Sequence, residues 1–216
     1  MRSALLLLLC AATSLAGRAN PNTLTPAESA AGWHLLFDGR SLDGWRASDD
    51  PGTFSTRDGL IVVKGPRSHL YYIGPVADHV FRDFELSLEV RTFPQANSGV
   101  YFHTAWQPVG WPAKGYEGQV NNSHSDPSRT AGLWGIQAIT EAPARDGEWF
   151  TLVIRVQGRR ITTAVDGRTL IDYTEPAAAP RPKGLEQRLL DAGTFALQGH
   201  DPGSEVHFRS IKVRAL

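Results

Sequence analysis

The chain has 216 residues, with 22 basic and 22 acidic side chains and a single cysteine, Cys10. This length suits one domain with a hydrophobic core of its own. The even charge balance argues against the basic surface that nucleic-acid binding requires, and no polybasic segment indicates attachment to anionic lipids. Because Cys10 stands alone, an internal disulfide and a cysteine-bound metal are both excluded.

The first nineteen residues have the layout of a secretory signal peptide. Arg2 gives a positive start, Ala4–Ala12 form an apolar run rich in leucine, and small residues follow up to Ala19. The apolar run is shorter than the roughly 20 residues that a membrane-spanning helix needs. We therefore expect cleavage after Gly17 or Ala19, and export to the periplasm or the outside of the cell.

Residues 20–31 are rich in proline, alanine and threonine, which indicates a linker, and residues 32–216 are expected to form one domain. Over Arg82–Phe93 and Trp149–Val156, apolar and polar side chains alternate with the period of two that is typical of half-buried strands. No segment keeps a helical period over ten residues. Further strands are expected on both sides of Arg57-Asp58-Gly59 and at Ser98–His103, Tyr116–Asn121, Arg160–Val165, Thr169–Tyr173, Thr194–Gly199 and Glu205–Val213.

The pair Asp166-Gly167 between two β-rich runs predicts a tight hairpin. Short strands at regular spacing, separated by Gly, Pro and Asp turns, are typical of a sandwich or a barrel. We therefore predict an all-β fold, a two-sheet antiparallel β-sandwich of the jelly-roll kind. The long irregular stretches Ala105–Lys114 and Asn122–Ala131 are expected to carry function, because long loops in a compact sandwich often do.

The sequence contains no nucleophile elbow, zinc-protease motif, phosphate loop or dinucleotide fingerprint, so function must be argued from strand faces. In a strand over Tyr116–Asn121, Glu117, Gln119 and Asn121 share one face. Gln and Asn are poor strand formers, and Gly118 marks a bulge or a close approach of backbones. A solvated outer face is the alternative interpretation of this pattern.

Two other expected strands present polar side chains in the same way. Ser98–His103 places Tyr101 and His103 on one face, and the strand near residue 195 is followed by Gln198 and His200. If these strands are neighbours in one sheet, that face collects imidazoles, amides and the Glu117 carboxylate. Such a surface is typical of sugar binding or of catalysis.

A third cluster, Lys64-Gly65-Pro66-Arg67-Ser68-His69, is expected to form a turn rich in hydrogen-bond donors between two strands. Lys64, Arg67 and His69 would donate hydrogen bonds to the hydroxyl or carbonyl oxygens of a ligand. An exposed basic loop without a ligand is the alternative.

Several motifs together resemble the 3-keto-disaccharide hydrolase domain family. The resemblance covers Trp33 to Leu216 and implies a concanavalin A-like jelly roll that cleaves glycosides already oxidised to a ketone at sugar carbon 3. The Glu-x-Gln of the family corresponds to Glu117 and Gln119 and its late histidine to His200, whereas His103 stands where the family often has arginine. The motifs that carry the resemblance, in chain order, are Leu36-Phe37-Asp38-Gly39 through Gly44-Trp45, Asp83-Phe84-Glu85-Leu86, Asn97-Ser98-Gly99-Val100-Tyr101-Phe102, Gly115-Tyr116-Glu117-Gly118-Gln119-Val120, Gly147-Glu148-Trp149, and Leu197-Gln198-Gly199-His200 through Phe208-Arg209-Ser210-Ile211.

The chemistry of such a substrate defines the groups that a site needs. A ketone at carbon 3 acidifies the proton on carbon 2, so a base can form an enediolate that expels the oxygen on carbon 1, after which water adds. We predict Glu117, His103 and His200 as catalytic residues, and these three could also ligate a divalent metal ion. No organic cofactor is expected. The predicted substrate-binding residues are Lys64, Arg67, His69, Tyr101, Gln119, Asn121, Trp134 and Gln198, with Arg67 and Lys64 steadying the oxyanion.

A noncatalytic carbohydrate-binding module of the cell envelope is the alternative, because the same fold and polar face would serve it. A purely structural envelope domain is a third interpretation. For an enzyme and for a binding module alike, the expected partner is a carbohydrate. No nucleic-acid partner and no membrane-spanning segment are expected. The sequence leaves the oligomeric state, the sugar and the aglycone open.

Overall fold

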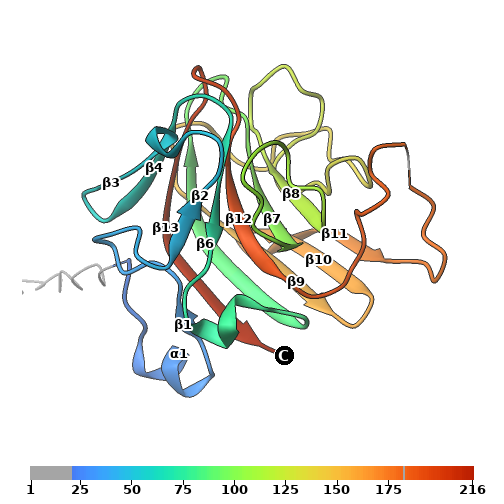
Figure 1. The fold of residues 1–216 in the computed structure, drawn as a ribbon, viewed down its shortest axis with the longest axis horizontal. Coiled ribbons are helices and arrows are strands. Elements are labelled where there is room, and N and C mark those ends of the chain that lie inside the picture. The colour runs from blue at the N-terminus through green and yellow to red at the C-terminus, as the bar shows by residue number, and fades with distance from the viewer. Residues whose placement is uncertain (1–20, 182) are drawn as a thin grey trace, which may run out of the picture.

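The structure, a computed structural model, describes residues 21–181 and 183–216, so the expected signal peptide lies outside the described residues. Two antiparallel sheets pack face to face (Figure 1), which confirms the predicted all-β sandwich. One sheet has eight strands in the order β11-β10-β9-β6-β13-β4-β3, with β1 paired to β13, and the other has five in the order β2-β5-β12-β7-β8.

The strands of the larger sheet are β1 (His34–Leu35), β3 (Phe54–Arg57), β4 (Leu60–Lys64), β6 (Phe84–Thr92), β9 (Phe150–Gln157), β10 (Arg160–Val165), β11 (Arg168–Thr174) and β13 (Glu205–Ala215). Those of the smaller sheet are β2 (Trp45–Ala47), β5 (Ser68–Tyr72), β7 (Ser98–Thr104), β8 (Tyr116–Val120) and β12 (Thr194–Gly199). The described helices are short: α1 (Pro26–Ala30) and the 3-10 turns η1 (Pro51–Thr53) and η2 (Val76–His79). None of them is long and apolar enough to cross a bilayer.

Alternation decides which side of each strand enters the core. In β9 the side chains of Phe150, Leu152, Ile154 and Val156 are buried, while the residues between them are not. The antiparallel pairing with β6 sets Leu88 opposite Leu152, so the apolar sides of both strands meet on the inner face of the sheet. Burial of these side chains between the sheets provides the main driving force for folding.

Two hairpins form at the predicted Asp-Gly pairs. Asp58 and Gly59 have φ values of 52° and 76°, and Asp166 and Gly167 have 48° and 80°. Positive φ at both central residues defines the tight turn whose twist matches that of the flanking strands. Glycine tolerates this conformation without cost and aspartate better than most residues, which is why the sequence signal was reliable.

Three local features differ from the sequence-based expectation. Strand β5 begins at Ser68, so the expected donor-rich turn is confined to residues 65–67. Within the expected linker, α1 carries a complete capping box between Thr25 and Glu28. Asn22 is buried and donates to the carbonyl of Gly59, so this segment packs onto the sandwich.

Candidate functional site

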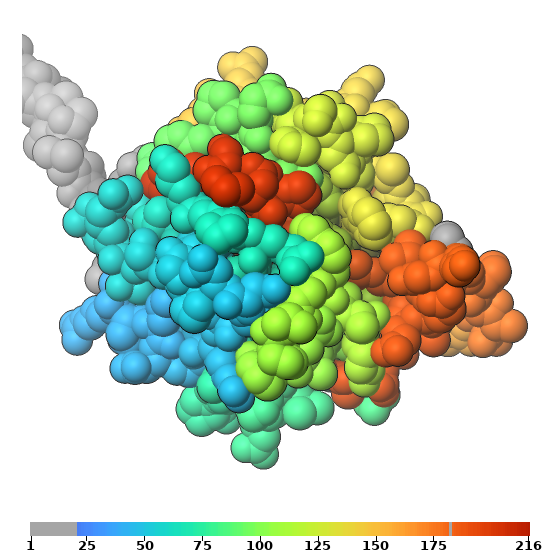
Figure 2. Space-filling model, turned by 45° about the horizontal axis from the view of Figure 1, so that its top comes forward, coloured from blue at the N-terminus to red at the C-terminus, as the bar shows by residue number. Residues whose placement is uncertain are grey.

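A cavity of about 480 Å³ lies on the outer face of the five-stranded sheet. Figure 2 shows this face, where the lime segment near residue 110 and the red turn after β12 lie close together although they are far apart in sequence. The cavity is large enough for a small saccharide, and its walls combine aromatic and polar groups. Its lining residues are Asn97, Tyr101, Trp111, Pro112, Ala113, Glu117, Gln119, Asp126, Trp134, Gly184, Leu185, Arg188, Gln198 and His200.

Glu117 stands on β8 with its carboxylate buried. One carboxylate oxygen accepts a hydrogen bond from Gln198 Nε2 at 3.0 Å, and the other lies 3.4 Å from Arg188 Nη2. Burial raises the pKa of Glu117, while the positive charge of Arg188 and the hydrogen bonds oppose that shift. A carboxylate in this setting has greater proton affinity than one in water, which suits a general base.

Arg188 lines the cavity, although the sequence analysis did not predict it as a site residue. Its side chain is 4% exposed, and its guanidinium lies 5.1 Å from the ring centre of Tyr101 and 5.6 Å from that of Trp134. One guanidinium nitrogen, Nη1, has no hydrogen-bond partner among the described residues. A buried cation beside a carboxylate, with a donor left over, can stabilise negative charge that develops on a bound ligand.

The segment that carries Arg188 is irregular but anchored. Glu175 accepts hydrogen bonds from the Tyr116 hydroxyl, from Arg181 Nη2 at 3.1 Å and from the backbone N–H of Leu190 at 2.9 Å. This buried network ties both ends of the 175–190 segment to β8. The position of Arg188 therefore depends on contacts that only the folded chain creates.

Trp134 is placed by backbone pairing with the edge of the sheet. Its N–H donates to the carbonyl of Glu117 at 3.0 Å, and the N–H of Gln119 donates to the carbonyl of Gly132 at 2.8 Å. The segment after β8 thus folds back on that strand and sets the Trp134 ring beside Arg188.

The stretch of residues 105–114, which was expected to carry function, forms another wall of the cavity through Trp111, Pro112 and Ala113. The Asp49 carboxylate accepts the N–H of Gly110 at 3.1 Å and pairs with Arg67 at 3.1 Å. The Arg67 guanidinium lies 5.5 Å from the ring centre of Trp111. Arg67 therefore supports a wall of the cavity, and it is not itself a lining residue.

Two amide side chains in the cavity have acceptor oxygens to spare. Gln119 Nε2 donates to Asn97 Oδ1 at 2.7 Å, and Gln198 Nε2 also lies 3.1 Å from the Tyr101 hydroxyl. Within the described part of the chain, the Oε1 atoms of Gln119 and Gln198 have no partner. Unpartnered buried acceptors are costly, and the hydroxyl groups of a sugar could satisfy them.

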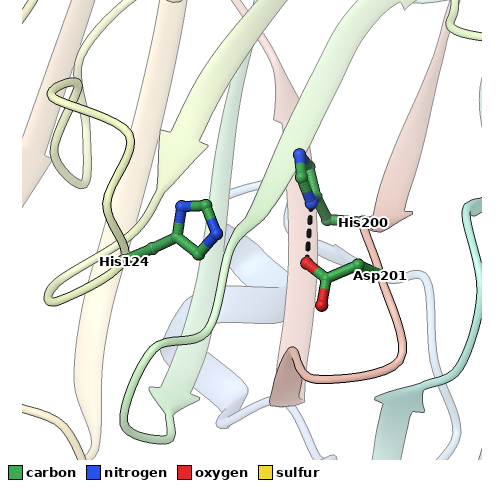
Figure 3. Close-up of side chains that lie close together, drawn as sticks. All are labelled: His124, His200 and Asp201. Atoms are coloured by element: carbon green, nitrogen blue, oxygen red, sulfur yellow. Dashed lines mark hydrogen bonds and ion pairs between the residues drawn. The ribbon is translucent and has the colours of Figure 1, made fainter.

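His200 lies beside the cavity together with a second histidine and an aspartate, His124 and Asp201 (Figure 3). His200 Nδ1 lies 2.7 Å from Asp201 Oδ2, and the two imidazole ring centres are 5.6 Å apart. The 122–131 loop, which was also expected to be functional, contributes His124 here and Asp126 to the cavity wall. His200 is thus a lining residue of the cavity, and its expected catalytic role stays a prediction.

His103 was expected on the same face, and that placement is wrong. Thr194 pairs with Thr104 but Ala196 with Tyr101, so β7 has one extra residue, and His103 has a φ of 55°. This bulge breaks the alternation, and the His103 ring packs against Phe84 of the opposite sheet. With Nε2 donating to the Arg82 carbonyl and Nδ1 accepting the Asp191 N–H, both ring nitrogens are used. Burial also lowers the pKa of His103.

Other predicted contacts lie outside the cavity lining. Lys64 is at the end of β4 in the other sheet, is largely exposed, pairs with Glu205 at 2.9 Å and is not among the lining residues. Asn121 is buried, and its amide donates to the carbonyls of Asp126 and Ser128 at 3.0 and 2.8 Å. It organises the following loop and does not face a ligand.

His69 is fully buried behind the cavity wall. Its ring contacts those of Tyr101 and Trp111 edge-on, with centres 5.3 and 5.5 Å away. Neither ring nitrogen has a hydrogen-bond partner in the described residues, and burial lowers the pKa of His69 to about 3. The residue supports the aromatic wall as a neutral ring and does not line the cavity.

As the alternation in β8 predicted, Glu117 and Gln119 lie on one face, and both line the cavity. Glu117 and Gln119 meet Tyr101, Gln198 and His200 because β12, β7 and β8 are neighbours in one sheet. The predicted Trp134 also lines the cavity, whereas Arg188, Trp111 and Asn97 were missed. The sequence carried no signal for Arg188, since the segment around it follows no strand or helix period.

Fold and site together define a lectin-like β-sandwich with an aromatic and polar cavity on the outer face of one sheet. The chain belongs to the family of the 3-keto-alpha-glucoside-1,2-lyase-like domain, which it matches over residues 32–214. The expected family is thus confirmed, and the cavity lies within the matched region.

Known proteins agree with this assignment. The chain is 24% identical to a 3-keto-disaccharide hydrolase of Bacteroides thetaiotaomicron over 87% of its own length and 79% of that protein. It resembles the crystal structure of a suspected glycosyl hydrolase from Parabacteroides distasonis, with a TM-score of 0.78 and 21% identity, covering 90% of this chain and 99% of that one. The carbohydrate-binding module CBM66 of Bacillus subtilis has a similar fold, with a TM-score of 0.56 and 13% identity over 80% and 96% of the two chains.

Proposed function

We propose that this protein is an enzyme that cleaves glycosides carrying a ketone at sugar carbon 3. Family membership and the name of the Bacteroides relative support the carbohydrate class and the oxidised substrate. The observation that carries the proposal is the pairing of buried Glu117 with Arg188 inside a cavity of saccharide size. This arrangement supplies a base and a stabilising cation at adjacent positions.

The proposed reaction begins with proton transfer. Glu117 removes the proton from carbon 2, and the electron pair of that bond forms an enediolate whose negative charge develops on the carbon 3 oxygen. Arg188 stabilises this oxygen, the role first assigned to Arg67 and Lys64. The bond from carbon 1 to the glycosidic oxygen then breaks, and that oxygen leaves with the proton that Glu117 had taken up. Addition of water across the resulting double bond completes the hydrolysis.

The remaining lining residues fix the sugar. The free acceptor oxygens of Gln119 and Gln198 would take hydrogen bonds from sugar hydroxyls. Trp111 and Trp134 offer aromatic surface to the apolar face of a pyranose ring. This route differs from ordinary glycosidases, in which two carboxylates flank the anomeric carbon.

The test compares a 3-keto-glucoside with the unoxidised glucoside. We expect release of reducing sugar from the first only, because only a ketone acidifies the carbon 2 proton. Exchange of the carbon 2 hydrogen for solvent deuterium, followed by mass spectrometry, would report the first step separately. Cleavage of both substrates at equal rates would contradict the mechanism.

A noncatalytic carbohydrate-binding module remains the second candidate, favoured by the fold similarity to CBM66. A binding module would retain the 3-keto-glucoside unchanged, with saturable heat in calorimetry and no product. Incubation for hours at high protein concentration, with product analysis by chromatography, separates the two functions.

We also propose that the protein is exported, on the basis of the signal-peptide layout of residues 1–19. The expected mature N-terminus lies between Arg18 and Asn22. Sequencing of the N-terminus of protein recovered from the native host checks this, and an intact Met1 would refute it.

A further inference from the structure

Two imidazoles and a carboxylate converge beside the cavity (Figure 3). One coordinating atom from each of His124, His200 and Asp201 lies within 4.8 Å of the others. His124 comes from the loop after β8, and the other two come from the turn between β12 and β13. We propose that these three residues bind a divalent transition-metal ion. The proposal does not depend on the catalytic steps given above.

The donor set fits a metal of this class. Two imidazoles and one carboxylate suit zinc, manganese, nickel or a similar ion better than calcium, which prefers oxygen ligands. Bonds of about 2.0–2.2 Å at tetrahedral angles place neighbouring ligand atoms roughly 3.3–3.6 Å apart, so the side chains must close on an ion by no more than about 1.5 Å. Three protein ligands leave coordination positions for water or for a ligand oxygen.

The surrounding hydrogen bonds hold the donors in place. Asp201 Oδ1 accepts the N–H of Gly203 at 2.8 Å, and Asp201 Oδ2 accepts the Ser204 hydroxyl at 2.7 Å. On the other side, the N–H of His124 donates to Asn121 Oδ1 at 2.8 Å. All three proposed ligands are partly buried, which limits side-chain motion and still allows an ion to enter. This support explains why Asn121 is a buried polar residue without a place in the cavity.

His124 must give up the hydrogen bonds that its Nδ1 accepts if the ion binds through Nε2. Its Nδ1 accepts the N–H of Asp126 at 3.1 Å and lies 3.4 Å from the donor Asn97 Nδ2. A ring that binds a metal through Nε2 carries its proton on Nδ1, so that N–H would lose its acceptor. The amide signal of Asp126 in an NMR spectrum is therefore a specific reporter of metal binding at this place.

The test uses tag-free, chelator-treated full-length mature protein, titrated separately with Zn²⁺, Mn²⁺ and Co²⁺ by calorimetry in the absence of sugar. We expect one ion per chain for at least one of these metals. His124→Asn, His200→Asn and Asp201→Asn should each weaken binding by at least about 10²-fold, the upper range for loss of supporting groups around a metal. The matched control is His79→Asn, which removes an exposed histidine, and asparagine tolerates the left-handed backbone of that position.

Absence of saturable binding for all three metals would overturn the proposal, as would equal affinity in the wild type and the three variants. Thermal unfolding in the presence of chelator shows whether each variant is folded. If a variant is unfolded, NMR of the wild-type protein decides instead. The metal that binds must shift or broaden the amide signals of His124, Asp126 and Asp201, and changes confined to other residues would refute the site. Because no sugar is present, failure here leaves the proposed hydrolysis untouched, and failure of hydrolysis leaves the metal site untouched.

Discussion

At the scale of single residues, two glycines make room for the site. A Cβ atom at Gly118 would lie 2.9 Å from Ile154 Cδ1 of the opposite sheet, so the glycine leaves room for the Ile154 side chain. A Cβ atom at Gly99 would lie 2.5 Å from Glu117 Oε1. The Glu117 carboxylate can therefore occupy its position only because residue 99 has no side chain.

Gly99→Ala should displace the Glu117 carboxylate from Gln198 and Arg188. We expect turnover of a 3-keto-glucoside to fall about 10²-fold, the scale for a displaced general base. The free energy of unfolding should fall by only about 1–3 kcal/mol, the range for overpacking. Steady-state kinetics and urea unfolding check the two numbers. An active Gly99→Ala variant would mean that the carboxylate position does not matter for the reaction.

Glu117→Gln should lower both activity and stability, because Arg188 would remain buried without its partner. Loss of one member of a buried ion pair costs about 3–5 kcal/mol, whereas neutral replacement of both is often tolerated. We expect turnover to fall at least about 10²-fold. The double variant Glu117→Gln/Arg188→Met should recover most of the stability and none of the activity. Recovery of activity in the double variant would show that the pair is only structural.

At the scale of elements, the site depends on irregular segments held against a regular sheet. β8 and β12 supply Glu117 and Gln198, while Arg188 and Trp111 come from loops. The buried carboxylate of Glu175 fastens the loop of Arg188 through Tyr116 and Arg181. Burial raises the pKa of Tyr116, so its hydroxyl stays protonated and donates to Glu175.

Glu175→Gln should loosen this loop while the sandwich stays folded. The charge that holds Arg181 disappears, so we expect trypsin to cut after Lys183 at least about tenfold faster, since proteolysis follows local opening. Limited proteolysis with mass spectrometry measures the rate. Asp172→Asn is the control, because its pair with Arg160 is exposed and such pairs contribute little. Equal cleavage rates in the two variants would contradict the anchoring role.

At the scale of the whole molecule, buried neutral histidine couples stability to pH. Burial lowers the pKa of His69 to about 3, with Asp49 opposing the shift and Arg67, Arg188 and His200 adding to it. The unfolded chain has a histidine pKa near 6.5. Above that pH, His69 is neutral in both the folded and the unfolded state, so its stabilising contribution to the free energy of unfolding is fully present. As the pH falls from about 6.5 toward 3, only the unfolded state takes up the proton, so stability decreases.

The expected loss is about 2 kcal/mol for His69 alone between pH 7 and pH 5, at about 1.4 kcal/mol per pH unit once the unfolded state is protonated. Urea unfolding of the wild type and of His69→Phe at both pH values isolates this contribution, because all other titrating groups are shared. The wild type should lose about 2 kcal/mol more than the variant over this interval. Identical losses would show that His69 is protonated in the folded protein.

The amino-acid sequence by itself determined the strands, the tight hairpins and the strand face on which Glu117 and Gln119 lie. Alternation along Phe84–Thr92 and Phe150–Gln157 and the Asp-Gly pairs are local signals, and local backbone geometry is enough to interpret them. The shared strand face of Glu117 and Gln119 is also a local signal, because every second side chain of a strand points to the same face.

Only the tertiary structure decided which distant groups meet those residues. The bulge at His103 depends on pairing with β12, about 90 residues further along the chain. Alternation within β7 therefore predicted the wrong face for the His103 side chain. Arg188 and His124 lie in segments without a period, and their positions follow from buried carboxylate and amide networks. Because such contacts join residues far apart in sequence, they have no local pattern from which they could be predicted.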